Sequence, residues 1–113
     1  MKKRSAYLPF TMYALQALGT QIAVARRELG WTAADLAQRL GVTAQVVSRI
    51  EHGAPSTSVG TVIEAAVLCG IPLFETHPDD VRAMAIVAEN ERLRLALLPS
   101  RSRRRPVEVS SEF

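Results

Sequence analysis

Cysteine, histidine and long apolar runs are all scarce in this chain of 113 residues. It has one cysteine, Cys69, and two histidines, His52 and His77. A single cysteine excludes an intrachain disulfide, and these three residues are too few and too badly spaced to form a zinc finger. Because no run of about 18 apolar residues exists, we expect no transmembrane helix. We therefore expect a cytoplasmic protein without a metal or a cofactor.

Groups of residues that carry out catalysis are missing as well. No Ser/His/Asp or Cys/His set occurs in the sequence at a usable arrangement. Cys69 lies in an apolar helical segment, which is typical of a buried thiol rather than a nucleophile. We therefore expect that the chain is not an enzyme.

Positive charge is concentrated at the two ends of the chain, whose formal net charge is +3. Residues 20–74 carry four positive and four negative groups and are balanced. Basic ends commonly contact phosphate, because each neutralised phosphate releases counterions, although solvated tails are often charged too. We predict a basic arm over residues 1–10 and a basic flexible tail over 99–113. The charges come from Lys2, Lys3 and Arg4, and from Arg101, Arg103, Arg104 and Arg105.

The spacing of apolar residues predicts an all-α fold, a compact bundle of about five helices. The first helix is expected over residues 11–29, capped by Thr11, although Gly19 favours a start nearer Thr20. Short helices are expected over 33–40, 44–51 and 59–69, and a longer one over 79–98. We expect the fourth helix to be capped by Ser58 and to bury Ile63. Further core residues are expected at Ile71, Leu73 and Phe74.

Two of the short helices are joined by the turn Gly41-Val42-Thr43. Thr32 and Asp35 form the capping pattern that starts the first of them, and Thr43 caps the second. Ala37 is small enough for a close helix crossing, and Gly41 permits the positive φ that ends the first helix. This pattern predicts a helix-turn-helix domain over residues 11–78, with the outer face of the second helix free.

That outer face presents residue types that can read base edges in a DNA major groove. Gln45 can bond adenine and Arg49 guanine with two hydrogen bonds each, Ser48 can bond bases or phosphates, and Ala44 can touch a thymine methyl group. The competing interpretation is a plain helical hairpin with a solvated polar face, in which Arg49 pairs with an acid such as Asp35.

Phosphate contacts are predicted around this helix, where helix N-termini and cationic side chains gather. The exposed arginines are solubility groups in the alternative interpretation, and the hydroxyls are simple helix caps. The predicted phosphate-binding residues are Thr32, Ala33, Arg39, Thr43, Thr57 and Ser58, and Arg26 and Arg27 are further candidates.

The segments Gly30-Trp31-Thr32, Asp35-Leu36-Ala37, Leu40-Gly41-Val42 and Val47-Ser48-Arg49-Ile50-Glu51-x-Gly53 resemble the Xre/Cro-type helix-turn-helix of phage repressors. The resemblance covers about half of the chain and implies a lambda-repressor-like fold. It also implies that Glu51 is structural and bonds back within the fold. The family pattern has glutamine where this chain has Ala33, so one phosphate contact is absent or comes from a backbone amide.

A narrower resemblance, to HipB-type antitoxins, rests on Gly30-Trp31-Thr32 and on the Ser/Thr-rich residues 56–62. It implies a homodimeric repressor that binds double-stranded operator DNA, autoregulates its operon and partners a HipA-like kinase toxin. Such a protein is cytoplasmic and lies at the nucleoid when it is bound to DNA. We expect the helix over 79–98 to be the dimer element. The alternative function is a protein-interaction module that binds and masks a partner enzyme.

Overall fold

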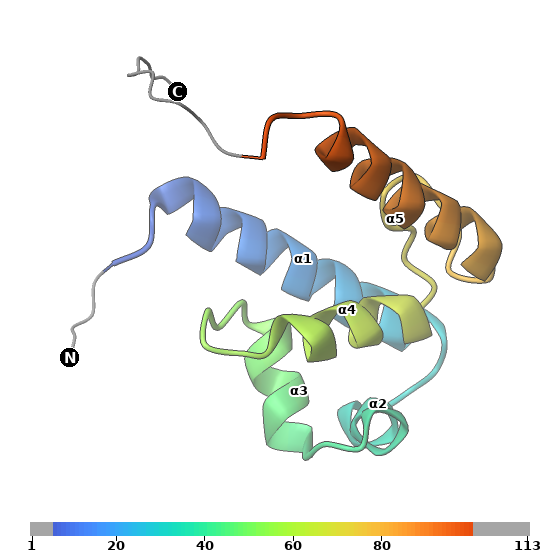
Figure 1. The fold of residues 1–113 in the computed structure, drawn as a ribbon. Helices are drawn as coiled ribbons and strands as arrows, with labels where there is room; N and C mark the ends of the chain where they lie inside the picture. Colours follow the sequence, from blue (N-terminus) through green and yellow to red (C-terminus); the bar gives the residue numbers. More distant parts are fainter. Residues whose placement is uncertain (1–5, 101–113) are drawn as a thin grey trace. The chain divides into compact units, whose positions relative to one another are not determined.

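The computed structural model describes residues 6–100, and the fold over that range is all-α, as the sequence predicts (Figure 1). Within this range the only β-type pairing is an isolated bridge between Leu73 and Thr76. None of the helices of the described part combines the length and the apolar content that crossing a membrane requires. The helices are α1 (Pro9–Glu28), α2 (Ala33–Leu40), α3 (Ala44–Glu51), α4 (Val59–Leu68) and α5 (Val81–Ala96).

The chain divides after Asp79 into two compact units. The first unit holds α1 to α4. Its core forms where α1, α2, α3 and α4 each turn a few apolar side chains inward, and α2 packs against both α3 and α4. Burial of aliphatic side chains is the main stabilising contribution in such a core. The buried core residues are Ile22, Leu36, Ala37, Val47, Ile50, Ala65, Ala66 and Cys69.

Helix α1 begins earlier than the sequence indicates. Its N-cap is Leu8 and Pro9 occupies the first turn, so the expected start at Thr11 or Thr20 is wrong. Proline suits the first turn because its missing N–H would have no partner there in any helix. The helix continues through Gly19, which is buried and does not end it. The cost of glycine in a helix is outweighed here by tertiary packing.

Gly19 and Gly53 lie where α1 crosses the end of α3 at backbone distance. A Cβ atom on Gly19 would meet the carbonyl oxygen of Ile50 and would lie 2.8 Å from that of Glu51. A Cβ atom on Gly53 would lie 2.9 Å from the backbone nitrogen of Gln16. Gly53 also has a φ of 77°, which disfavours other residues. The two glycines therefore set the close approach of α1 to α3.

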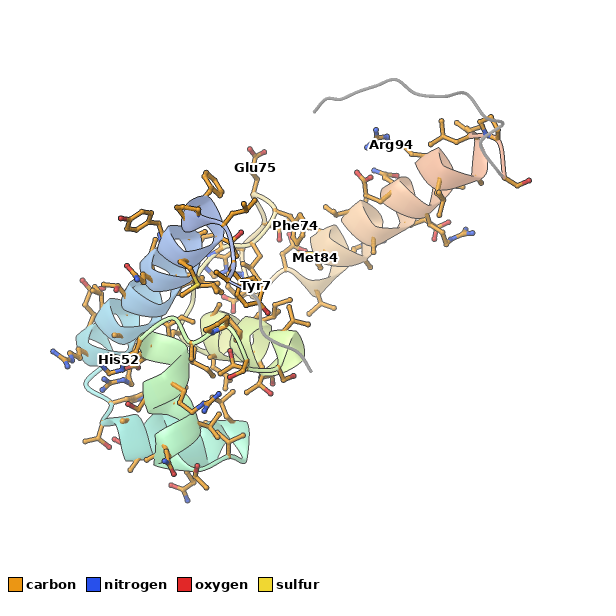
Figure 2. The ribbon with its side chains drawn as sticks, turned by 90° about the vertical axis from the view of Figure 1, so that its left-hand side faces the viewer. Tyr7, His52, Phe74, Glu75, Met84 and Arg94 are labelled. Carbon is orange, nitrogen blue, oxygen red and sulfur yellow. The ribbon has the colours of Figure 1, made fainter. Side chains whose placement is uncertain are left out.

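Three further expectations are wrong in the region from α4 to the end of the first unit. They concern the cap at Ser58 and the burial of Ile63 and Phe74. Ser58 is the N-cap residue of α4, but its side chain makes no capping hydrogen bond. Ile63 is 44% exposed, because α4 turns Ala65 and Ala66 inward instead. Phe74 is 74% exposed, since it occupies a tight turn rather than the core. Figure 2 labels Phe74 and Glu75 on this turn.

The second unit contains α5, which is shorter than the predicted 79–98 by two residues at each end. The Asp80 carboxylate caps it by accepting a hydrogen bond from the Ala83 amide at 2.9 Å. None of the residues of α5 is buried. The predicted basic tail falls mostly on residues 101–113, and the basic residues of the predicted arm fall on 1–5, so both lie outside the described residues.

Candidate nucleic-acid interface

The α2–turn–α3 element is built from local hydrogen bonds that the sequence predicts. The Asp35 amide donates to Thr32 Oγ1 at 3.0 Å, and the Thr32 amide donates to Asp35 Oδ2 at 2.8 Å. These two reciprocal bonds complete the capping box. Gly41 ends α2 with a φ of 73°, and Thr43 Oγ1 then accepts from the Val46 amide at 3.3 Å. The chain thus turns sharply from α2 into α3.

Helix α3 has one buried and one exposed face. Val47 and Ile50 are only 1% and 4% exposed, and they pack in the core of the first unit. The outer face is open to solvent, as predicted, and stays available to a ligand. Its exposed residues are Thr43, Ala44, Gln45, Ser48 and Arg49, which are the predicted base-reading residues together with the cap of the helix.

Arg49 reaches across to the loop before α4, where its guanidinium donates to the Ser56 hydroxyl. The alternative pairing of Arg49 with Asp35 is not what the structure shows, because the Arg49 guanidinium is bonded to Ser56. Ser56 was not among the predicted site residues. The sequence shows only a serine in a Ser/Thr-rich loop, and nothing local connects it with an arginine seven positions earlier.

A groove lies between α3 and the start of α4. From α3 and its cap it is lined by Val42, Thr43, Gln45, Val46 and Arg49, and from the loop and α4 by Ser56, Thr57, Ser58 and Thr61. The groove therefore brings together five predicted site residues from two separate segments of the chain. They are Thr43, Gln45, Arg49, Thr57 and Ser58. Val46 and Thr61 are lining residues that the sequence did not single out. Ala44, Ser48, Thr32, Ala33 and Arg39 are not part of this groove.

The two hydroxyls at the start of α4 differ in what they already bind. Thr57 Oγ1 donates to the Ala54 carbonyl at 3.0 Å, so its hydrogen is engaged within the loop. Ser58 makes no capping bond and is exposed. The first amides of a helix have no carbonyl partner within it and attract anions. The start of α4 thus offers Ser58 and its following amides to an anion at the rim of the groove.

Arg39 and the start of α2 form a second predicted phosphate region. The Arg39 guanidinium carbon lies 4.1 Å from the centroid of the Trp31 ring, an arrangement that holds the cation over an aromatic face. Its Nη1 also donates to the Asp35 carbonyl at 3.3 Å. Trp31 itself packs against the core of the first unit. Arg39 is exposed and oriented by these contacts, while the Thr32 hydroxyl is used in the capping box.

The expectation that Arg26 binds phosphate is wrong. It is 6% exposed, and its Nε donates to Glu51 Oε2 at 2.6 Å. A buried guanidinium needs a carboxylate to offset the loss of water, and Glu51 supplies one. This hydrogen bond and the Glu51 charge outweigh burial and raise the pKa of Arg26. The structural role of Glu51 that the resemblance implies is therefore present.

The folded first unit carries little positive charge of its own. Residues 6–79 include four arginines and six carboxylates, and one arginine is neutralised in the Arg26–Glu51 pair. Phosphate attraction scales with the number of cations brought to the backbone. The strongly basic clusters of the chain are at residues 2–4 and 101–105.

Capped α2, a tight glycine turn and α3 with a free polar face define a helix-turn-helix protein. A family model described as a helix-turn-helix domain matches residues 17–83, more than half of the chain. The chain belongs to this helix-turn-helix domain family and is of the DNA-binding regulator class. A search of curated proteins finds no match to the chain.

Proposed function

We propose that this protein is a sequence-specific repressor that binds operator DNA as a homodimer. The observation that carries the proposal is the outer face of α3, where Gln45 and Arg49 are both exposed beside a groove. Both side chains can form two hydrogen bonds to a single purine, which suits them to direct readout. No catalytic role is part of the proposal.

In this arrangement α3 lies in the major groove with its exposed outer face toward the bases. Gln45 bonds adenine, Arg49 leaves Ser56 and bonds guanine, and Ala44 contacts a thymine methyl group. Ser48 lies one turn further along the same face as Ala44 and assists. Phosphates are held by the start of α4 with Ser58, and by the start of α2 together with Arg39 from the last turn of that helix. The basic residues at both ends of the chain add non-specific attraction.

The test is the effect of Arg49→Ala on binding to a sequence selected from random duplex DNA by the full chain. We expect a loss of about 1–3 kcal/mol in binding free energy and a relaxed preference at one base position. Arg82→Ala is the matched control, since it removes an equal charge from the exposed part of α5. Equal affinities of Arg49→Ala and the parent chain would remove Arg49 from the reading role. Failure to select any sequence would contradict the proposal as a whole.

We further propose that the chain is an antitoxin that neutralises a HipA-like kinase toxin and represses the operon they share. The support is the resemblance of residues 30–32 and 56–62 to HipB-type proteins. The test is the neighbouring reading frame: its product should be a kinase-like protein that binds this chain and loses its toxicity. A neighbour of another kind, or a kinase that this chain does not bind, would contradict the antitoxin role and leave DNA binding untouched.

A second candidate function is an interaction module that masks a partner enzyme. It is favoured by large side chains exposed at the start of α1: Leu8 is 73%, Phe10 is 83% and Tyr13 is 70% exposed. Exposed aromatic side chains are enriched at protein contacts. Replacing Phe10 and Tyr13 by serine should abolish partner binding under this function. Under the operator-binding function it should leave DNA affinity unchanged.

A further inference from the structure

Helix α5 and its C-cap residue Leu97 carry a stripe of residues spaced as in a coiled coil. Ile86 is 53%, Leu93 is 49% and Leu97 is 85% exposed, so this stripe presents large aliphatic side chains to solvent. Intervals of three and four residues define the a and d positions of a heptad repeat. The stripe consists of Ala83 (a), Ile86 (d), Asn90 (a), Leu93 (d) and Leu97 (a).

The residues beside the stripe are charged in a complementary way. Glu89 takes a g position and Arg94 the following e position, five residues later. In a parallel two-stranded coiled coil, a g residue faces the next e residue of the other helix. Glu89 of each chain would therefore lie beside Arg94 of the second copy, so that each dimer has two such pairs.

The ion pairs that Glu89 and Arg94 make within one chain do not prevent this pairing between chains. Glu89 is paired with Arg92, and Arg94 Nη1 lies 2.9 Å from Glu91 Oε1. All four side chains are at least half exposed. Exposed pairs of this kind contribute little, so exchanging them for pairs between chains costs little. Arg94 is labelled in Figure 2 on the second half of α5.

The other apolar stripe of α5 is a poorer seam. It runs through Val81, Met84, Ala88, Glu91 and Leu95, and it places a carboxylate at a core position. In a parallel pair Glu91 would face its own copy, which is repulsive. Asn90 is different, because two copies of its amide can hydrogen-bond each other across a seam. A single asparagine at an a position is a known determinant of register and of two-stranded pairing.

We propose that α5 pairs with α5 of a second copy as a short parallel coiled coil, with Asn90 opposite Asn90 and Glu89 bound to Arg94 of the other chain. This inference rests on the proposed function only for the role of the dimer, which is to present two α3 helices to two half-sites of operator DNA. A seam of about two heptads is short, so the dimer is concentration-dependent and is strengthened when both half-sites are occupied.

The test mixes two charge-reversed full-length chains, Glu89→Arg and Arg94→Glu. Each variant alone exchanges two attractive pairs for two repulsive ones, and we expect its dimer to dissociate about tenfold more readily than the parent. The mixed dimer restores both attractive pairs, so mixing should recover the parent's association in sedimentation. Any loss of helix stability is common to the separate and the mixed samples. Variants that associate like the parent, or a mixture no tighter than its components, would overturn the proposal.

Cross-linking tests which face of α5 forms the seam and whether the two helices run parallel. In a parallel seam Leu93→Cys places two thiols at the same d position, and we expect a disulfide dimer under mild oxidation. Leu95→Cys, on the opposite side of α5, is the matched control and should stay monomeric. The native Cys69 is buried, so the parent chain should not cross-link. Cross-linking of Leu95→Cys but not of Leu93→Cys would overturn the proposal.

The outcome is separable from that of the operator-binding proposal. If the proposed seam is wrong, the charge-reversed variants, their mixture or the cysteine variants will give the overturning results above, while the parent chain can still select a DNA sequence. If operator binding is wrong, the charge-reversed chains will still prefer each other, while no sequence is selected.

Discussion

Arg26 and Glu51, 25 positions apart, form a two-pronged ion pair that joins α1 to the last residue of α3. Arg26 Nε and Nη2 donate to the two Glu51 carboxylate oxygens at 2.6 and 3.0 Å, and Nη1 donates to the Trp31 carbonyl at 2.8 Å. The two side chains are 7% and 10% exposed. Because Glu51 ends α3, the pair ties the helix that presents Gln45 and Arg49 to the body of the unit.

Removing one partner of this pair should be far more costly than removing both. Arg26→Met and Glu51→Leu each leave an uncompensated buried charge, and each should lower the free energy of unfolding by about 3–5 kcal/mol. The double variant should recover most of that loss. Denaturant unfolding measures all three. Arg92→Met, in an exposed pair with Glu89, is the control and should change stability by less than about 1 kcal/mol. Losses that simply add in the double variant would contradict the coupling.

The close crossing of α1 and α3 predicts opposite effects of alanine at different glycines. Gly19→Ala should lower the free energy of unfolding by about 2 kcal/mol or more, because its Cβ meets α3 carbonyl oxygens that cannot move alone. Gly60→Ala is the matched control on α4. Its Cβ would find only Ser58 Oγ at 3.8 Å, so it should raise stability by about 0.5–1 kcal/mol. Thermal unfolding measures both, and a neutral Gly19→Ala would refute the close approach.

The α2 cap predicts a component of acid sensitivity. The hydrogen bond from the Thr32 backbone amide, and then that with its side chain, lower the pKa of Asp35. The carboxylate therefore contributes its full stabilisation above the unfolded pKa of about 3.9, and this is lost as the pH falls through the lower folded pKa. Asp35→Asn keeps an acceptor without a titrating group. Its free energy of unfolding should fall less steeply than the parent's below about pH 4 in denaturant titrations, and an identical slope would contradict the prediction.

Substitutions in the turn between Leu73 and Thr76 should raise the free energy of unfolding. Phe74 and Glu75 have φ values of 53° and 60°, which are costly for residues other than glycine and asparagine. Leu73 and Thr76 exchange two backbone hydrogen bonds around them, as in a two-residue hairpin turn. The double substitution Phe74→Asn with Glu75→Gly should raise the free energy of unfolding by about 1–2 kcal/mol. Phe74→Ala with Glu75→Ala should not, because alanine keeps the strain; thermal unfolding compares the two.

Much of the site could be predicted because its signals are local. The Thr32–Asp35 capping box, the positive φ of Gly41 and the Thr43 cap each involve residues at most three positions apart. Helical periodicity likewise separates the buried Val47 and Ile50 from the exposed face of α3. These features depend on backbone geometry and on the spacing of apolar residues, both of which can be read from a few consecutive positions. Base reading by that face stays a prediction.

Other features depend on which distant residues the fold brings together. From the sequence alone, Arg26 is typical of a surface arginine and Gly19 is typical of a helix breaker. The fold places Glu51 beside Arg26 and the end of α3 against Gly19. Arg49 could be assigned to an acid because no local rule points to Ser56. The amino-acid order thus determined the helices, their caps and the polar face of α3, since short-range hydrogen bonding and periodicity suffice for these. Only tertiary contacts decided the partners of Arg26 and Arg49 and the crossing at Gly19, since burial and backbone approach arise between segments far apart in the chain.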